Sequence, residues 1–305
     1  MTFRERVLGW DIVGSSKKWT TISAVVIGIG LVAMIVNMIS FGSPLRFGID
    51  FIGGTIINAS FEKVPDEAVV RSILADNGYA GVTVQKTGDT GISMKVEATE
   101  IDPAVSGKIL GAIEAKYGAM DKGTKEITSI APVLGRDLLK RSALALGVAL
   151  LFTLLYITIR FKWSFGLATI AALLHDVLVT LGILALFRIP LNAPFVGALL
   201  AIITYSVQDS VVVLDRVREK LRYRTKEPFD KLANTAVTET WMRSFNTSFT
   251  TFLAVLALFL LGGSPVRDFS ATLLIGIVAG TYSSLYIVVP LLVQWSQRSG
   301  KTARL

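Results

Sequence analysis

Cysteine is absent from this chain of 305 residues, and histidine occurs only once. Without thiols the chain has no disulfide framework, no thiolate metal site and no cysteine nucleophile. One histidine leaves almost no material for a zinc site or a Ser/His/Asp triad. The phosphate-binding pattern G-x-x-x-x-G-K-[ST] is missing too, which argues against ATP as a fuel. We therefore expect neither an enzyme nor a bound metal or cofactor.

Charged residues are also scarce, at 18% against about 25% in ordinary soluble domains. Apolar residues make up 52% of the chain and the mean hydropathy is +0.58, so most of it is expected in a bilayer. The formal net charge is nevertheless +8. In a soluble protein such a surplus suggests nucleic acid as a partner, so its distribution decides its meaning.

A transmembrane helix needs about 20 mostly apolar residues. Six stretches meet this requirement, at residues 20–41, 142–159, 165–187, 193–214, 245–262 and 269–292. The first is far longer than the apolar part of a signal peptide, and no A-x-A-like site follows it. We expect it to remain as a membrane anchor.

The lysine and arginine distribution predicts the orientation, because basic residues concentrate in cytoplasmic segments. Apart from Arg243, sixteen of the 31 basic residues lie before the first stretch, between the second and third, between the fourth and fifth, and after the sixth. The short connections on the other side hold only Arg188 and Arg267. We therefore predict that both termini are cytoplasmic, and the positive surplus is mainly an orientation signal, not a sign of nucleic acid.

Residues 44–137, between the first two stretches, have the pattern of a soluble domain. Alternation at 55–62, 82–86 and 92–97 and a closing segment at 126–130 predict strands, with a turn at 88–91. A helical run is predicted to open at Pro65-Asp66, and a second helix at Asp102-Pro103, where aspartate fits the N-cap and proline the first helical position. The resulting order β-α-β-β-α-β is ferredoxin-like, a scaffold that by itself says nothing about activity.

The predicted fold is a polytopic α-helical membrane protein with six transmembrane helices. One α+β ferredoxin-like periplasmic domain, at 44–137, is inserted between helices 1 and 2. Residues 1–19 form the cytoplasmic N-terminus and 20–41 the first helix. Residues 138–305 hold helices 2–6, with a cytoplasmic loop at 215–240 and a cytoplasmic C-terminus.

Asp209 is the sharpest functional candidate, because ionisable residues inside apolar spans are costly. It lies six residues before the charged pair Asp215-Arg216, hence about 9 Å into the membrane at 1.5 Å per residue. Its polar neighbours in the fourth span are Tyr205, Ser206, Gln208 and Ser210. The alternative interpretation is a helix–helix hydrogen bond made by a protonated aspartate.

Arg243 follows Glu239 by four residues, which puts it about 6 Å deep from the same side and within reach of Asp209. A nearby arginine favours the ionised acid, so its withdrawal would favour proton uptake. Polar residues recur from it at helical spacing and indicate a water-lined face: Asn246, Thr247, Thr250 and Thr251. An arginine that snorkels to lipid headgroups is the alternative.

His175 and Asp176 lie near the middle of the third span, where they could extend a proton relay. A structural hydrogen bond between helices is an equal alternative. Adjacent helical residues point about 100° apart, so at most one of the two needs to face the path.

Gly276-x-x-x-Gly280 in the sixth span permits close helix approach, and packing is the interpretation we favour.

Several stretches resemble the SecD/SecF family of the resistance-nodulation-division (RND) superfamily. Residues 47–55 resemble its F-G-x-D-F-x-G-G-T motif, which includes Gly48, Asp50, Gly53 and Gly54. Residues 205–219 resemble its fourth-span motif, and residues 243–251, leading to 260–263, its fifth-span motif. Residues 131–135 and 174–178 agree as well. Gln208 and Phe245 depart from the family pattern. These departures do not affect Asp209 and Arg243, which match the family.

The resemblance implies an accessory subunit of the Sec preprotein translocase in the bacterial cytoplasmic (inner) membrane. Such a subunit uses the proton motive force to complete translocation after the ATPase SecA has acted. By the same resemblance, Asp209 and Arg243 match the charges needed for proton-coupled movement. The implied partners are SecD, the SecYEG channel, SecA and the translocating preprotein, with YajC and YidC as further candidates, and membrane lipid but no nucleic acid.

Six spans with polar faces and one large outer loop are also typical of half of a pseudo-twofold transporter, which independently predicts a partner half. Two other functions stay open. The chain could be an assembly subunit whose charges only hold helices together, or half of an RND exporter of lipids or small molecules. The coupling ion is expected to be H⁺, although a carboxylate with Ser and Gln neighbours could also serve Na⁺.

Overall fold

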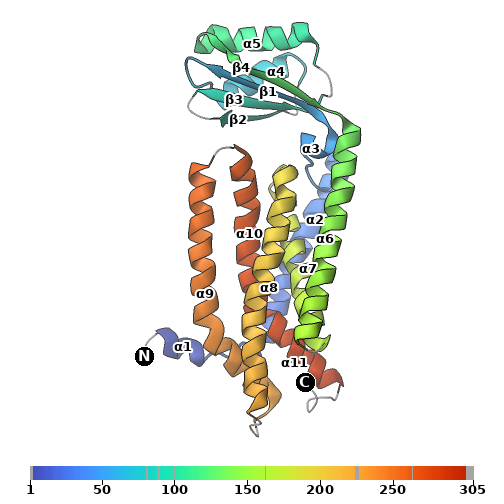
Figure 1. Cartoon of the computed structure of the whole chain (residues 1–305), viewed down its shortest axis with the longest axis vertical. Helices are drawn as coiled ribbons and strands as arrows, with labels where there is room; N and C mark the ends of the chain where they lie inside the picture. The colour runs from blue at the N-terminus through green and yellow to red at the C-terminus, as the bar shows by residue number, and fades with distance from the viewer. Residues whose placement is uncertain are drawn as a thin grey trace.

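The computed structural model describes residues 3–79, 82–87, 90–98, 101–161, 163–223, 227–262 and 264–299. A bundle of long helices carries a small sheet domain at one end, and helices α1 (Phe3–Leu8) and α11 (Val288–Ser299) lie at the opposite end (Figure 1). The predicted turn residues Gly88 and Asp89 lie outside the described residues. So do five of the basic residues used for orientation: Lys162, Arg224, Lys226, Lys301 and Arg304.

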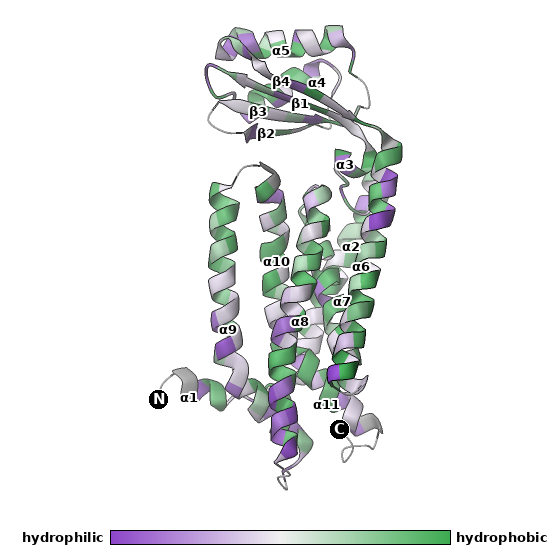
Figure 2. Cartoon of the chain, in the orientation of Figure 1, coloured by the Kyte–Doolittle hydropathy of each residue, from purple (hydrophilic) through white to green (hydrophobic). Residues whose placement is uncertain are grey.

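Six segments of the described chain are long and apolar enough to cross a membrane, which confirms the predicted fold class. Hydrophobic residues dominate most of their length, whereas hydrophilic residues gather where α8 extends beyond the bundle (Figure 2). The segments are α2 (Ser16–Phe41), α6 (Pro132–Arg160), α7 (Trp163–Leu186), α8 (Ala193–Arg222), α9 (Phe229–Leu261), and α10 (Ser264–Tyr286) together with α11.

Three helices extend well past the charge-free stretches seen in the sequence. Helix α6 begins ten residues before the apolar stretch expected at 142–159, and its first turns carry an Asp137–Arg141 ion pair of 2.7 Å. Helix α8 continues to Arg222 and α9 begins at Phe229. Charge ends the apolar run but not the helix, because charged residues four apart on one helix face support each other.

The last span is interrupted, which the sequence analysis did not predict. Helix α10 ends at Tyr286 and α11 begins at Val288. Pro290 explains the break, since proline lacks an N–H and its ring clashes with the carbonyl four residues earlier, that of Tyr286.

The sheet domain confirms the ferredoxin-like order. Its strands are β1 (Gly54–Phe61), β2 (Thr83–Thr87), β3 (Gly91–Val96) and β4 (Met120–Ile130). They form one antiparallel sheet in the order β2-β3-β1-β4. Helices α4 (Glu67–Asp76) and α5 (Pro103–Tyr117) follow β1 and β3 and bury apolar residues against the sheet.

Both helices begin at an aspartate cap, which confirms the prediction for Asp102 and adds one at Asp66. The Asp66 carboxylate accepts hydrogen bonds from the N–H groups of Ala68 and Val69, and Asp102 accepts one from Ala104. Strand β4 begins six residues earlier than expected, because a register shift near Ser60 lets a polar segment stay paired with β1.

Glycines set the closest helix contacts in the bundle. A Cβ placed on Gly30 of α2 would lie 2.6 Å from the Cα of Gly182 on α7, so the two backbones touch there. The Gly276-x-x-x-Gly280 pair plays the predicted packing role. A Cβ on Gly276 would meet the side chain of Ile202 on α8 at 2.1 Å, and one on Gly280 would meet Ser206 at 3.1 Å.

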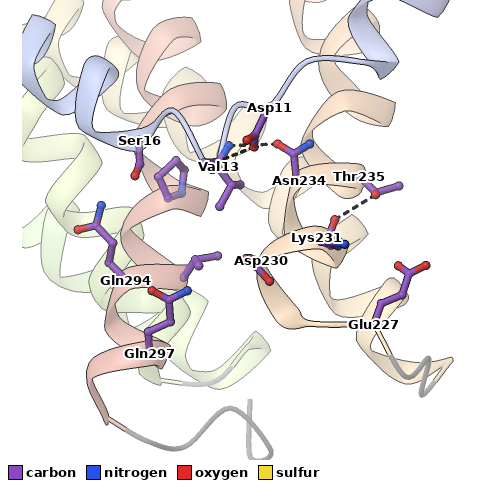
Figure 3. Close-up of a pocket in the computed structure, with 13 residues that line it drawn as sticks. Asp11, Val13, Ser16, Glu227, Asp230, Lys231, Asn234, Thr235, Gln294 and Gln297 are labelled. Atoms are coloured by element: carbon purple, nitrogen blue, oxygen red, sulfur yellow. Dashed lines mark hydrogen bonds between the residues drawn. The ribbon is translucent and has the colours of Figure 1, made fainter.

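The segment after α1 is fastened to the first turns of α9. Asn234 Oδ1 accepts from the N–H groups of Ile12 (2.8 Å) and Val13 (3.1 Å), and its Nδ2 donates to the carbonyl of Trp10 (2.8 Å). Asn234 borders a hollow of about 620 Å³ formed by this segment, α9 and α11 (Figure 3). These contacts fix the beginning of the helix that carries Arg243.

The Gly30–Gly182 crossing can be tested with a neighbouring glycine as control. Gly30→Val forces α2 away from α7, and we expect a loss of about 1–3 kcal/mol of stability, as for other overpacked sites. Gly28→Val should change stability little, because a Cβ at Gly28 meets nothing within 4 Å. Thermal unfolding of the purified protein in detergent measures both, and equal midpoints would contradict the close crossing.

Candidate functional site

The four predicted relay residues lie on α7, α8 and α9 and fall into two polar centres that α10 joins. Asp176 of α7 is 1% exposed and is the core of the first centre. Its Oδ2 accepts hydrogen bonds from Ser206 of α8 (2.6 Å) and Ser283 of α10 (2.9 Å), and its Oδ1 lies 3.0 Å from His175 Nδ1. The structure therefore brings both members of the His175–Asp176 pair into one network, where the sequence required only one.

The second centre surrounds Asp209 of α8. Its carboxylate accepts a hydrogen bond from the hydroxyl of Ser284 on α10, a fully buried residue. Ser244 of α9 also faces this carboxylate, and the Arg243 guanidinium attracts it electrostatically. Asp209 and Arg243 do not form one of the ion pairs found among the described residues, so the predicted pair is an attraction over a longer distance.

The two centres share their supporting helices. Ser206 and Asp209 are three residues apart on one face of α8, and the adjacent residues Ser283 and Ser284 of α10 bind one carboxylate each. Sequence reasoning missed the two α10 serines. The sequence does show two adjacent serines in an apolar span. Which carboxylate each serine binds, however, depends on the packing of α10 against α8.

The predicted polar lining on α9 lies on a face that the rest of the chain leaves uncovered. Arg243, Asn246, Thr247 and Thr250 are exposed in the isolated chain, and Thr251 is half-buried. The threonine hydroxyls donate to carbonyls one turn earlier in α9, as in Thr247 to Arg243 O at 2.9 Å. These three hydroxyls are therefore satisfied within the helix.

The predicted lining residues Tyr205 and Gln208 of α8 have different surroundings. The Tyr205 hydroxyl donates to Ser248 on α9 at 2.9 Å, so it joins two helices. Gln208 is exposed on the surface of α8.

An ion-pair cluster joins α8 to α9 beyond Asp209 and Arg243, at the end away from the sheet domain. The Glu239 carboxylate accepts from Arg216 Nε (2.7 Å) and from Lys220 Nζ (2.7 Å). Glu239 is one helical turn from Arg243, so this cluster sets how α9 lies beside α8 close to the second centre.

The glycine motif connects the sheet domain to the bundle. Gly48 N–H donates to the Leu191 carbonyl at 2.7 Å, and a Cβ at Gly48 would overlap the side chain of Asn192. Gly53 and Gly54 have φ values of 86° and 156°, which side chains disfavour, and a Cβ at Gly54 would lie 2.5 Å from the Val96 carbonyl. The motif is therefore a tightly packed junction.

Asp50 of this motif binds the start of α8. Its Oδ2 accepts from the N–H of Ala193, the first residue of α8, at 2.7 Å. The neighbouring Asn192 donates to Asp268 near the start of α10 at 2.8 Å. The helices that hold Asp209 and its partner Ser284 thus both begin at the sheet-domain junction.

No group of three or more His, Asp or Glu residues within the described ranges is placed to hold a metal ion.

The Asp50 cap predicts a graded response to substitution. Asp50→Ala should destabilise the start of α8 by about 0.5–2 kcal/mol, the usual effect of losing a side-chain cap. Asp50→Asn keeps an acceptor oxygen and should therefore retain most of the stability of the start of α8. Hydrogen exchange of the amides at 193–196 measures the effect, and equal exchange in both variants would show that Asp50 does not cap α8.

Comparisons with known proteins agree with this arrangement. Residues 110–298 match the family "Protein export membrane protein SecD/SecF, C-terminal", and residues 39–63 match the "SecD/SecF GG Motif". The second match covers the glycine junction, and the first covers every residue of both polar centres.

Curated relatives named protein translocase subunit SecF match over most of their length. The protein from Gemmatimonas aurantiaca is 34% identical over 287 residues, which cover 90% of this chain and 85% of the relative. The protein from Pseudomonas aeruginosa is 34% identical over 266 residues, covering 86% and 87%.

Solved structures of SecDF share the fold. The crystal structure of SecDF from Thermus thermophilus, described as a translocon-associated membrane protein, superposes with a TM-score of 0.79 at 29% identity over 95% of this chain. A super-membrane-facing form of SecDF gives a TM-score of 0.67. The chain spans 39% of the length of the SecDF chain.

Proposed function

Since the chain belongs to the SecD/SecF family and is an accessory subunit of the Sec translocase, we propose that it uses the proton motive force to complete protein translocation. In this proposal Asp209 takes up and releases the proton, and Arg243, His175 and Asp176 complete the relay. The observation that carries it is the Asp209 carboxylate, held by Ser284 inside an apolar bundle and attracted by Arg243. A carboxylate inside a membrane span is costly, so its presence there points to a function.

Protonation changes the forces on three helices. An ionised Asp209 accepts the Ser284 hydroxyl strongly and attracts Arg243, which draws α10 and α9 towards α8. A neutral Asp209 loses the attraction to Arg243. Since α8 and α10 both begin at contacts with the sheet-domain junction, a shift of either helix reaches that domain through Asp50, Asn192 and Asp268.

We infer SecD as the partner from the face that α9 leaves uncovered. Arg243, Asn246, Thr247 and Thr250 are exposed in the isolated chain, and a charged residue on such a face is costly against lipid. A second polar membrane half covers this face more favourably. The SecDF chain, more than twice as long as this one, fits a complex in which SecD supplies that half.

The proposed orientation follows the basic residues: both termini cytoplasmic in an inner membrane, with the sheet domain outside. The hollow in Figure 3 then opens at the cytoplasmic end. Contacts with SecYEG, SecA, YajC and YidC stay predictions.

The central experiment replaces the carboxylate without changing its size. Asp209→Asn should abolish the proton-gradient-dependent part of translocation in membrane vesicles that contain SecD, while the complex with SecD still co-purifies. Asp215→Asn is the matched control, because Asp215 lies two turns further along α8 and is exposed. Vesicles with Asp215→Asn should show the same gradient-dependent translocation as vesicles with the unmodified chain.

Two results would overturn the proposal. Unchanged gradient-dependent translocation in Asp209→Asn would remove the relay. Loss of co-purification with SecD in that variant would favour the alternative function, an assembly subunit whose charges hold helices together. Replacing the pH gradient with a Na⁺ gradient in the same vesicles distinguishes H⁺ from Na⁺ as the coupling ion.

The partner face can be mapped directly because the chain has no cysteine of its own. A photoactivatable maleimide probe on Asn246→Cys of α9 should crosslink to SecD. The same probe on Leu151→Cys of α6, a 54% exposed apolar residue, should crosslink mainly to lipid. Equal SecD crosslinking from both positions would show that the polar face of α9 is not the contact.

A further inference from the structure

A string of hydrogen bonds continues from His175 beyond the relay residues. His175 Nε2 lies 3.0 Å from the Ser23 hydroxyl of α2, and Ser23 donates to the Tyr282 hydroxyl of α10 at 3.5 Å. Tyr282 in turn donates to the carbonyl of Trp19 at 2.7 Å. Neither Ser23 nor Tyr282 has a role in the function proposed above.

One tautomer of the histidine satisfies all of these hydrogen bonds together. With the Tyr282 hydroxyl donating to Trp19 and the Ser23 hydroxyl donating to Tyr282, a hydrogen on His175 Nε2 donated to Ser23 completes the string. Two arrangements then satisfy Nδ1: a neutral histidine accepting from protonated Asp176, or a histidinium donating to ionised Asp176. In both, the pair as a whole holds one transferable proton.

The string runs from the middle of the bundle towards the end opposite the sheet domain. His175 is twelve residues into α7, whereas Trp19 lies in the first turn of α2 and Tyr282 in the last turns of α10. In Figure 1 these ends of α2 and α10 lie on the side of the bundle where α11 begins. The last acceptor is therefore near the membrane surface.

The surroundings of the string are apolar on one side. Ser23, His175 and Tyr282 border a hollow of about 440 Å³ whose other lining residues are apolar. Tyr282 of α10 stacks on the His175 ring, and the other groups that bond the pair are hydroxyls: Ser23 of α2 bonds His175, and Ser206 of α8 and Ser283 of α10 donate to Asp176. A proton on the pair therefore has no competing base within the apolar wall.

We propose that the His175–Asp176 pair is a proton-holding site of its own and that Ser23 and Tyr282 are its exit line to the end of the bundle where α2 begins. In the orientation proposed above this end is cytoplasmic, and the inference rests on the proposed function. When Asp176 gains a proton, His175 passes one from Nε2 to Ser23, Ser23 passes its own to Tyr282, and Tyr282 releases one to water near Trp19. One proton enters and one leaves. The imidazole ring of His175 then flips, which brings its remaining N–H back towards Ser23, and the hydroxyls turn back.

A purely structural role for these hydrogen bonds makes a different prediction, and α2 offers a matched control. Asn37, like Ser23, is buried on α2, and its Nδ2 donates to the Ala185 carbonyl of α7 at 2.8 Å. Asn37→Ala thus removes a hydrogen bond between the same two helices without touching the string. If Ser23 only joins helices, Ser23→Ala and Asn37→Ala should behave alike.

The test uses the full chain reconstituted with SecD in vesicles that contain a pH-sensitive dye. A positioned proton-transfer group contributes about 100-fold or more to a rate, so Ser23→Ala and Tyr282→Phe should each slow proton movement at least about tenfold. Ser23→Thr, which keeps the hydroxyl, should restore it. Asn37→Ala should keep the normal rate, and thermal unfolding should show equal losses of stability in Ser23→Ala and Asn37→Ala.

Comparison with Asp209→Asn separates the two proposals. If Asp209→Asn stops proton movement while Ser23→Ala and Tyr282→Phe match Asn37→Ala, the exit line is wrong and the proposed function stands. If Asp209→Asn leaves proton movement intact, the proposed function fails, and normal rates in the Ser23 and Tyr282 variants would overturn the exit line as well. Slow movement in those variants alone would assign conduction to the His175–Asp176 branch.

Discussion

The carboxylate of Asp176 organises the membrane part of this protein. It is almost completely buried and receives hydrogen bonds from α8 and α10 while its neighbour His175 reaches α2. In a bilayer no water is available to replace these partners, so a buried carboxylate requires its donors to stay in place. Close packing makes that possible: Gly280 allows α10 to approach Ser206, and Gly30 meets Gly182 seven residues beyond Ser23 and His175 on their respective helices. Small residues and polar contacts therefore specify the same helix arrangement.

The second carboxylate, Asp209, is less enclosed and belongs to the side of the bundle that lacks a partner. Its donor Ser284 lies next to Ser283, so α10 contacts both centres from adjacent residues. Helices α8 and α10 also begin at the junction that Asp50, Asn192 and Asp268 form with the sheet domain. A force applied at either carboxylate thus acts on helices whose other ends hold the sheet domain. This continuity is the physical basis for the coupling that we propose between proton movement and that domain.

Much of the architecture was readable from the sequence. The six spans, the cap at Asp102 and the order of the sheet domain follow from local rules of hydrophobic length, capping and alternation. Local rules predicted the bounds of some elements wrongly. Strand β4 is longer than its alternation indicates because it resumes pairing with β1 beyond an irregularity of its own, between Asp121 and Glu126. Pro290 divides a span that appears uniform by hydropathy.

The candidate site shows the same division. The sequence by itself determined that Asp209, His175 and Asp176 lie in membrane spans and Arg243 beside one, because charge in or next to an apolar run is conspicuous whatever the fold. Only the tertiary structure decided their partners: Ser284 with Asp209, Ser206 and Ser283 with Asp176, and Ser23 with His175. Serines are common in membrane helices and carry no such signal. Which serine meets which charge depends on the rotation and close approach of whole helices, a property of their packing and not of any one segment.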